Sequence, residues 1–438
     1  MAIPPNPFTP NAPIDPEYFA GRIGEVVKIQ SALNQTMHGK TQHILLAGER
    51  GIGKTSLGLY ARYIAKQPNP VLKTEFRYAT AYYTVERDQS LVDVCRGLAT
   101  RLLQNIDESL AKKCTDRLKK LKLHFAIHVP GLAEINVDPQ ALPEVESRLY
   151  ADFEKAIEEA WDELKNTYNG ILLVVDEIHN LGTFKGVGAF FKVVSEAWAV
   201  DGYRNAMFAV IGLPNVPTDI SDDDPSAPRI FSHVELKRMT TEECLNIVRN
   251  CITKSGKSIT DDAAAAIATR SGGFPYFLHQ LGYDAYEQDS DEKIDMDDLN
   301  LAFSTSLTQF ERMFFGGLYK SVEGRQKQKI VDALASCYSS PRTAAELART
   351  LKIKNVHQYL KPLEKDGIVE RAKSRYRLTS ELLSIYVQAR IGAGSDRVKL
   401  QVMSKYPLGT TESEPTPDPA ASRKTRKTEP DTSEGSGE

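Results

Sequence analysis

The feature that most constrains the fold is the octapeptide Gly48-Glu-Arg-Gly-Ile-Gly-Lys-Thr55, which fits the pattern GxxxxGK[ST] at every fixed position. An apolar segment, His43–Ala47, precedes it and is predicted to form a strand, and a helical segment, Ser56–Lys66, follows it. Glycines let consecutive backbone N–H groups turn towards one anion, and the positive end of the helix dipole adds to that attraction. The pattern predicts a phosphate-binding loop. The alternative is a structural loop that binds no phosphate.

The residues of this loop also indicate which ligand it binds. Lys54 can reach the β- and γ-phosphates of a nucleoside triphosphate, and the hydroxyl of Thr55 can hold a magnesium ion. We therefore expect ATP with Mg²⁺ at this site. The residues of this segment that are predicted to contact the nucleotide are Gly48, Glu49, Arg50, Gly51, Ile52, Gly53, Lys54, Thr55 and Ser56.

A second motif places two carboxylates directly after an apolar strand. The segment Ile171-Leu-Leu-Val-Val-Asp176-Glu177 is apolar until its last two residues, and ligands of open α/β sheets bind beyond the carboxyl ends of the strands. Asp176 is predicted to join Thr55 as a ligand of magnesium, and Glu177 to orient and deprotonate the attacking water. The segment alone also fits a strand end followed by a helix cap. The upstream phosphate loop favours the catalytic interpretation.

Apolar strands alternate with helical segments over residues 19–236, which predicts a parallel sheet covered by helices, an α/β fold of the P-loop NTPase type. The further strand candidates are Lys73–Tyr82, Gly170–Asp176 and Ala206–Gly212. The segment from about 107 to 166 is long for a simple crossover, so we interpret it as an insertion. Its basic stretch, Lys112–Lys122, fits either a solvated helix face or a nucleic-acid contact.

The rest of the chain divides by composition and capping signals. Residues 1–18 hold six prolines, which predict an extended arm without a helix. Residues 237–303 are expected to form a helical lid, and 304–324 a connecting helix. Residues 325–395 follow the order helix, helix, helix, hairpin, which is typical of a winged helix-turn-helix. Residues 407–438 contain no aromatic residue and are expected to be disordered.

Together these motifs resemble those of the AAA+ ATPases over residues 19–290. The segment Phe19-Ala-Gly-Arg22 is similar to a box that lies near the adenine in this family, which implies that Arg22 contacts the nucleotide. The resemblance also implies a catalytic polar sensor at Asn215, after the strand Ala206–Gly212. At Arg229 it implies a catalytic arginine finger that reaches a neighbouring subunit of a homo-oligomer in the ATP state. The alternative for this residue is a surface arginine.

The lid departs from the AAA+ pattern at one position. The family usually carries an arginine at the start of the third lid helix, and the matching piece here is Gly273-Phe-Pro-Tyr276, with tyrosine in its place. Gly273-Phe-Pro275 instead resembles the GxP element of the STAND signalling ATPases, which implies a nucleotide contact at Pro275. The resemblance therefore implies slow hydrolysis, as in a molecular switch. It leaves open whether Tyr276 replaces the arginine.

The predicted winged helix supplies candidate contacts to duplex DNA. Its recognition helix begins at Asn355, with Val356, Leu360 and Leu363 facing inward, and a wing follows that can contact phosphates or the minor groove. The alternative is a protein-docking module. The predicted DNA-binding residues are Asn355, His357, Gln358, Lys361, Arg371, Lys373, Arg375 and Arg377.

Charge is unevenly distributed along the chain, whose net charge is −3. Residues 325–405 hold 17 basic and 7 acidic side chains, a net of +10, whereas residues 1–324 hold 34 and 44, a net of −10. A basic module on an acidic body favours a polyanionic partner such as DNA. A solvated basic surface is the alternative.

A membrane-spanning helix needs about 18 consecutive apolar residues, and no apolar run in the sequence is that long. The first residues also lack the pattern of a signal peptide. We therefore expect no membrane contact and a cytoplasmic location. The five cysteines form no CxxC pair, so neither a disulfide framework nor a zinc site is indicated. Cys244 and Cys251 are expected to be buried thiols on one helix face.

The sequence thus predicts an ATP-binding and hydrolysing ATPase of AAA+ type that acts as a nucleotide-dependent switch or loader on DNA through its winged helix. The alternative is a STAND-like signalling or defence ATPase whose winged helix docks a protein or clamps the ADP state. A binding adaptor with a degenerate nucleotide site is disfavoured, because Lys54, Thr55, Asp176 and Glu177 are all intact.

Overall fold

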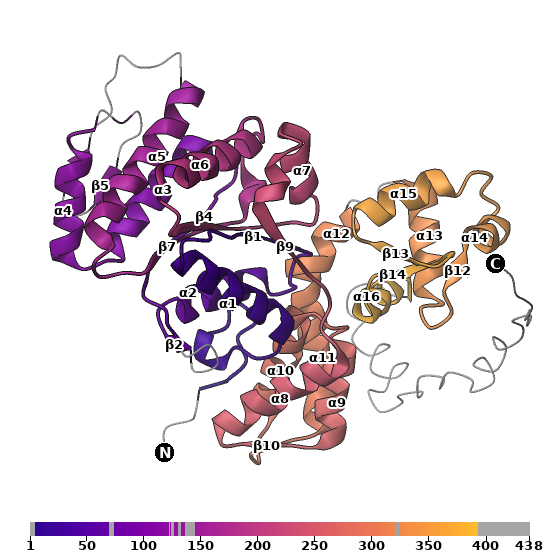
Figure 1. Cartoon of the computed structure of the whole chain (residues 1–438). Coiled ribbons are helices and arrows are strands. Elements are labelled where there is room, and N and C mark those ends of the chain that lie inside the picture. Colours follow the sequence, from indigo (N-terminus) through magenta and orange to yellow (C-terminus); the bar gives the residue numbers. More distant parts are fainter. Residues whose placement is uncertain are drawn as a thin grey trace, which may run out of the picture.

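The computed structural model describes residues 5–69, 74–121, 123, 127–129, 133–135, 145–320, 322 and 324–392 of the chain. An α/β domain lies beside a helical lid, and a smaller C-terminal module follows (Figure 1). Within these ranges, no helix is both long and apolar enough to cross a membrane. The predicted tail, residues 407–438, lies outside the described residues.

Five parallel strands form the central sheet in the order β4-β7-β8-β1-β9. They are β1 (His43–Gly48), β4 (Tyr78–Thr84), β7 (Gly170–Asp176), β8 (Ala206–Gly212) and β9 (Phe231–Leu236). The strands β1, β7 and β8 are buried along their whole length, as expected where helices cover both faces of a sheet. The predicted strand Lys73–Tyr82 is interrupted: β3 (Thr74–Glu75) pairs with β2 (Pro68–Asn69), and β4 begins only at Tyr78.

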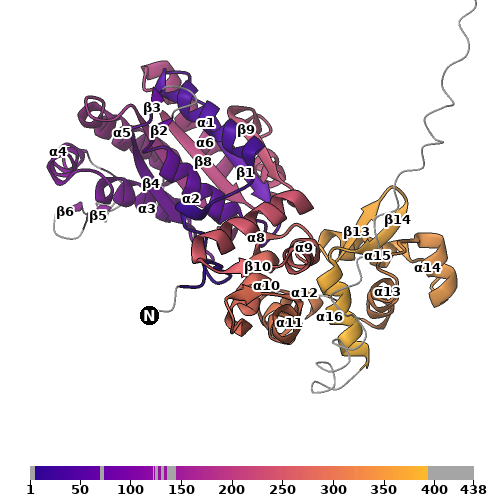
Figure 2. The same ribbon diagram turned by 90° about the horizontal axis from the view of Figure 1, so that it is seen from below.

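Successive residues of the buried strands pack into two cores on opposite faces of the sheet. Figure 2 gives a second view of the sheet and the helices around it. In β7, Leu172 and Val174 belong to the core of the first face, and Leu173 and Val175 to that of the second. Helices α1 (Ile23–Met37) and α2 (Lys54–Ile64) cover the first face. The second face carries α3 (Leu91–Gln104), α4 (Glu108–Leu118), α5 (Val145–Leu164) and α6 (Val187–Asp201). The first core continues through the lid into the C-terminal module, so these parts are packed together.

The region predicted to be an insertion contains α4, the hairpin of β5 (Ile127–Val129) and β6 (Ala133–Ile135), and α5. Helix α4 packs against α5 through Arg117, which lies 2.8 Å from Glu159 Oε2 and 2.5 Å from Glu163 Oε1. Acidic side chains of α5 therefore neutralise part of the basic stretch. This pairing favours a structural role for the stretch over a nucleic-acid contact.

Among the described residues, the lid and the connecting segment after it contain five α-helices, a π-helical turn and a two-stranded sheet. Thr240 forms a capping box with Glu243, and Thr260 accepts a hydrogen bond from the N–H of Ala263, as the capping signals predict. Helix α11 runs through residue 303 and into a π-helical turn. The elements are α8 (Thr241–Ser255), β10 (Ser258–Ile259), α9 (Asp261–Arg270), α10 (Pro275–Gln288), β11 (Lys293–Ile294), α11 (Met296–Phe310), η4 (Glu311–Phe315) and α12 (Gly316–Lys320).

The C-terminal module contains four helices and a small antiparallel sheet of order β12-β14-β13. Its elements are α13 (Arg325–Ala335), β12 (Arg342–Thr343), α14 (Ala344–Leu351), α15 (His357–Lys365), β13 (Val369–Ala372), β14 (Arg375–Leu378) and α16 (Glu381–Gly392). Two ion pairs join it to the lid region: Arg238 lies 2.9 Å from Glu370, and Arg270 pairs with Glu381.

Short elements connect the strands of the sheet: η2 (Ile178–Asn180), α7 (Val216–Asp223) and η3 (Ala227–Ile230). A 3₁₀ turn, η1 (Pro16–Tyr18), ends the N-terminal arm, so the expectation of an arm without any helix is wrong there. Asp15 accepts a hydrogen bond from the N–H of Glu17, and Pro16 occupies the first position of the turn. A capping side chain and a proline at that position are typical of a helix start.

Candidate active site

The predicted phosphate loop joins the end of β1 to the start of α2. Gly51 and Gly53 adopt φ angles of +73° and +92°, which residues with a side chain rarely adopt. Gly48 is fixed by crowding, since a Cβ there would lie 3.0 Å from Ile52 and 3.1 Å from Leu236. The glycines thus bring the loop backbone round to the first turn of α2, which begins at Lys54 and carries Thr55.

Lys54, the first residue of α2, is buried against the loop, and only 5% of its surface is exposed. Its Nζ donates a hydrogen bond to the carbonyl of Glu49 at 2.8 Å. Burial lowers the pKa of Lys54, while the nearby carboxylates of Glu177 and Asp176 oppose that shift. A buried ammonium flanked by a phosphate loop is suited to an anionic ligand, which would compensate the cost of burial.

Asp176 ends β7 as a fully buried carboxyl group. The hydroxyl of Tyr82, on the neighbouring strand β4, donates to Oδ2 at 2.7 Å, and the N–H of Glu177 donates to Oδ1 at 2.8 Å. Burial raises the pKa of Asp176, and hydrogen bonds from Tyr82 and Thr55 oppose the shift. The two predicted magnesium ligands therefore meet in the structure. Tyr82 was not predicted, because nothing in the sequence of β4 indicates which strand it pairs with.

Glu177 follows at a φ of +56°, a strained conformation for a residue with a side chain. Its side chain is about one-third exposed and lines a cavity next to Lys54. Nε2 of His179 lies 3.2 Å from Oε2 of Glu177, and this contact lowers the pKa of the carboxyl group against the opposing effect of burial. Glu177 is thus held ionised, as a general base must be. His179 was also missed, although it stands only two residues from Glu177.

Arg22 is buried behind the loop. Its guanidinium donates to the carbonyls of Ile52, at 2.9 Å, and Lys237, at 2.5 Å, and forms an ion pair with Glu25. The side chain therefore ties the loop to the segment that leads into the lid. Arg22 also contributes to the cavity wall, next to Ile52.

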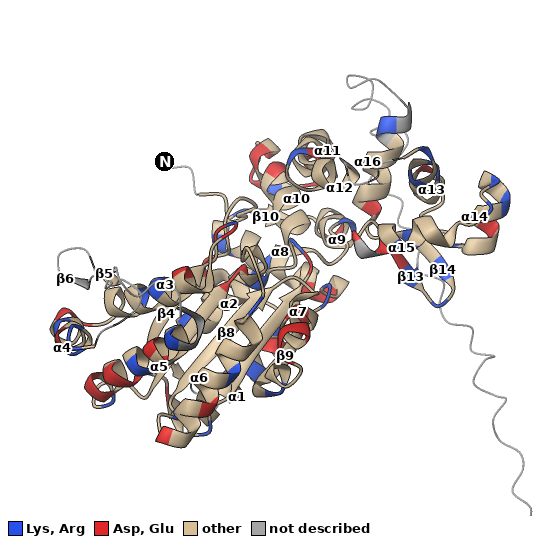
Figure 3. Ribbon diagram, turned by 90° about the horizontal axis from the view of Figure 1, so that it is seen from above, with Lys and Arg blue, Asp and Glu red and all other residues tan. Residues whose placement is uncertain are grey.

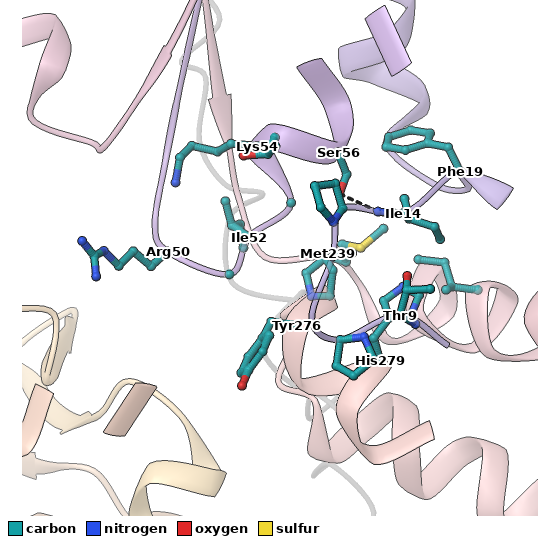
Figure 4. Close-up of a pocket in the computed structure, with 18 of the residues that line it drawn as sticks. Thr9, Ile14, Phe19, Arg50, Ile52, Lys54, Ser56, Met239, Tyr276 and His279 are labelled. Carbon is teal, nitrogen blue, oxygen red and sulfur yellow. Dashed lines mark hydrogen bonds between the residues drawn. The ribbon is translucent and has the colours of Figure 1, made fainter. Parts of the chain in front are cut away.

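A cavity of about 490 Å³ opens between the loop, the lid and the N-terminal arm (Figure 4). Lys54, Thr55 and Glu177 lie at its polar end, and Phe19, Met239 and Ile247 provide an apolar wall. A polar end with an apolar remainder matches a ligand that carries both phosphates and a base. The lining residues predicted from the sequence are Arg22, Arg50, Gly51, Ile52, Gly53, Lys54, Thr55, Ser56, Glu177 and Pro275.

The lid touches the phosphate loop directly. Pro275 begins α10 and lies against Gly53, where a Cβ would approach it to 3.5 Å. The N–H of Tyr276 lies 3.3 Å from the carbonyl of Gly51, to which it donates. The Gly273-Phe-Pro-Tyr276 element thus contacts the loop mainly through backbone and proline ring.

Residues 18–210 match the family model of the AAA ATPase domain. No curated protein matches the chain. Among solved structures, a Walker-type ATPase of Pyrococcus abyssi has a TM-score of 0.55 at 15% identity, over 85% of this chain and 97% of that one. The ORC2 protein of Aeropyrum pernix has a TM-score of 0.53 at 14% identity, over 88% and 95%. Both are similar to this chain in fold. These findings support a nucleotide-binding AAA+ P-loop ATPase.

Two residues that the AAA+ resemblance singled out lie outside this cavity. The side-chain amide of Asn215 donates to Asp219 on α7 at 2.6 Å, and Arg229 is exposed in η3. Strand β8 ends at Gly212, and the turn after it places Asn215 at the cap of α7 instead of at the strand end. Neither side chain lines the cavity with Lys54 and Glu177.

The predicted DNA contacts lie on the C-terminal module, far in sequence from the α/β domain. Asn355, His357, Gln358 and Lys361 are exposed in and just before α15, whereas Val356, Leu360 and Leu363 are buried, as the sequence predicts. On the hairpin, Arg371, Lys373 and Arg375 are exposed. Arg377 is half-buried and lies 2.5 Å from Glu370.

Proposed function

We propose that the chain binds ATP with Mg²⁺ in this cavity and hydrolyses it slowly, so that nucleotide state acts as a switch. One observation carries the proposal: Lys54, Thr55, Asp176 and Glu177 meet around one loop end. Thr55 and Asp176 provide the oxygen donors that Mg²⁺ prefers, and the ion would offset phosphate charge. Lys54 would hold the β- and γ-phosphates, and ionised Glu177 would accept a proton from the attacking water.

The surroundings of the site support slow turnover. Tyr276 stands where AAA+ lids usually carry an arginine, and Asn215 and Arg229 do not line the cavity. The exposed position of Arg229 fits a finger that acts on a neighbouring copy in an ATP-bound homo-oligomer. Assembly would then raise the rate.

The test of nucleotide binding is Lys54→Ala. Removing the ammonium group should weaken binding of ATP·Mg²⁺ by about 100-fold or more, because it deletes a charge-assisted hydrogen bond to phosphate in a buried site. Calorimetry on the full chain measures the affinity. Lys28→Ala, which removes an exposed lysine of α1, is the matched control. Wild-type affinity in Lys54→Ala would refute the proposed site.

We further propose that the C-terminal module is a winged helix that binds duplex DNA. Its exposed polar residues on α15 and exposed basic residues on the hairpin of β13 and β14 support this, together with the net charge of +10 over residues 325–405. The hairpin would contact phosphates, and α15 would present side chains to base edges. Nucleotide state would then govern DNA engagement by a switch or loader.

One set of contacts favours the signalling alternative. Arg238 and Arg270 pair with Glu370 and Glu381 of the C-terminal module, so the module is docked on the lid region in this structure. A docked module fits a closed, ADP-bound state in which a protein partner carries the output. Sedimentation with ATP or ADP, with and without duplex DNA, separates the proposals: a DNA-bound oligomer in ATP supports the first, and a closed monomer that ignores DNA supports the second.

A further inference from the structure

Residues 5–14, here called the strap, are anchored on lid helix α10 at one end. Phe8 is 1% exposed and packs against Gly282, where an added Cβ would lie 2.5 Å from its ring. The side-chain amide of Asn6 donates to the carbonyl of Tyr283, at 3.1 Å, and to Glu287, at 2.8 Å. This end of the strap is therefore held by one buried ring and two hydrogen bonds.

The other end of the strap is anchored on the helix that carries the phosphate loop. The N–H of Ile14 donates to the hydroxyl of Ser56 at 3.3 Å, and Ser56 lies in the first turn of α2, next to Thr55. Just beyond the strap, Phe19 stacks on Tyr60 of α2 with ring centroids 4.3 Å apart. The strap thus joins the lid to the α/β domain.

Between the two anchors the strap forms part of the cavity wall (Figure 4). Thr9, Pro10 and Pro13 line the cavity together with the phosphate loop. The N–H of Thr9 donates to Nδ1 of His279 at 3.3 Å, and burial lowers the pKa of His279 to about 4, so the imidazole stays neutral and can accept. Within the described residues, the buried hydroxyl oxygen of Thr9 has no hydrogen-bond partner.

We propose that the strap gates nucleotide exchange: a bound nucleotide leaves only after the strap detaches from α10. The inference rests on the proposed nucleotide binding in this cavity. Prolines at positions 5, 7, 10 and 13 restrict the detached strap, so little chain entropy is lost when it docks again. The strap would therefore set the lifetime of the bound state rather than the chemistry.

The first test is Phe8→Ala in the full chain. Loss of the buried ring weakens only the anchored state, so release of a fluorescent ADP analogue should accelerate at least about tenfold. Stopped-flow displacement by excess ADP measures the rate. Phe153→Ala is the matched control, because Phe153 is also fully buried but belongs to the core on the opposite face of the sheet. Release from Phe153→Ala should match the wild type.

Gly282→Ala provides a second route that leaves the strap sequence intact. Alanine favours a helix, yet its Cβ collides with Phe8 and should dislodge the strap, so release should again accelerate. Gly24→Ala in α1, where a Cβ meets no atom within 4 Å, is the control. Wild-type release rates in both folded variants, Phe8→Ala and Gly282→Ala, would overturn the gate while leaving nucleotide binding intact. Failure of the wild type to bind the analogue would overturn both proposals.

Discussion

The proposed nucleotide site and the C-terminal module differ in the burial of their charged side chains. Lys54, which lines the cavity, and Asp176, which ends β7, are both buried, and each has a hydrogen-bond partner. On the module, basic side chains of the β13–β14 hairpin such as Arg371 and Lys373 are exposed. Figure 3 shows blue, basic positions at the end of this hairpin.

This difference determines how far function can be inferred from each region. Burying an uncompensated charge costs free energy. A group of buried charged residues therefore indicates a ligand whose charges compensate theirs. Exposed charges are solvated whether or not a partner is bound, so they fit polyanions of many kinds. The four predictions below test this contrast.

The largest expected effect is on hydrolysis. Glu177→Gln keeps the shape of the side chain but removes the base, so turnover of ATP should fall by about 100-fold or more while ATP binding persists. Steady-state phosphate release and equilibrium binding measure the two quantities. Glu235→Gln, which changes an exposed side chain of β9 outside the cavity, is the matched control. Unchanged turnover in Glu177→Gln would show that another group activates the water.

The next effect concerns the exposed charges. Replacing Arg371, Lys373 and Arg375 together with alanine should flatten the salt dependence of duplex DNA affinity by about one unit for each phosphate that is no longer neutralised. Fluorescence anisotropy over a range of salt measures the slope. The control replaces three exposed lysines with alanine: Lys112 and Lys113 of α4 and Lys119, which caps its C-terminal end. An equal reduction of the slope in both variants would mean that DNA affinity depends on the overall charge of the protein and not on contacts made by the hairpin.

A smaller effect is expected on stability. Burial raises the pKa of Asp176, so the ionised group destabilises the folded protein above that pKa. Asp176→Asn should therefore raise the free energy of unfolding of the nucleotide-free protein at neutral pH by about 1 kcal/mol, while Mg²⁺-dependent nucleotide binding is lost. The gain should vanish as the pH falls and the native aspartate takes up its proton. Asp116→Asn, which changes an exposed residue of α4, should leave the free energy of unfolding measured in urea unchanged. Destabilisation by Asp176→Asn at neutral pH would contradict this account.

The smallest expected effect concerns an ion pair between the lid region and the C-terminal module. Glu370 pairs with both Arg238 and Arg377, so Glu370→Gln should loosen the docking of the module and free Arg377 for DNA. Partly exposed ion pairs contribute about 0.2–1 kcal/mol, so DNA affinity should rise no more than about fivefold. Glu364→Gln, exposed on α15, removes the same charge without breaking a pair seen in the structure and is the control. Equal gains in both variants would reduce the effect to net charge.

Features that depend on neighbouring residues were predictable from the sequence. The phosphate loop and the carboxylates at and just after the end of β7 arise from residues within a few positions of one another. The same is true of the capping boxes that Thr240 forms with Glu243 and Thr343 with Glu346. Backbone conformation and local hydrogen bonds determine such motifs, so the residues alone are informative. The pattern of buried and exposed positions in α15 is local in the same sense, because it follows the helical period.

Features that depend on contacts between distant residues were decided only by the tertiary structure. Tyr82 meets Asp176 because β4 pairs with β7, and Phe8 reaches Gly282 because the arm folds across the cavity. The turn after β8, together with the packing of α7, directs Asn215 away from the cavity, although its position in the sequence suggests a sensor. Sequence patterns determine the local conformational preferences of neighbouring residues. The pairing of strands and the burial of an aromatic ring depend instead on the whole packed core.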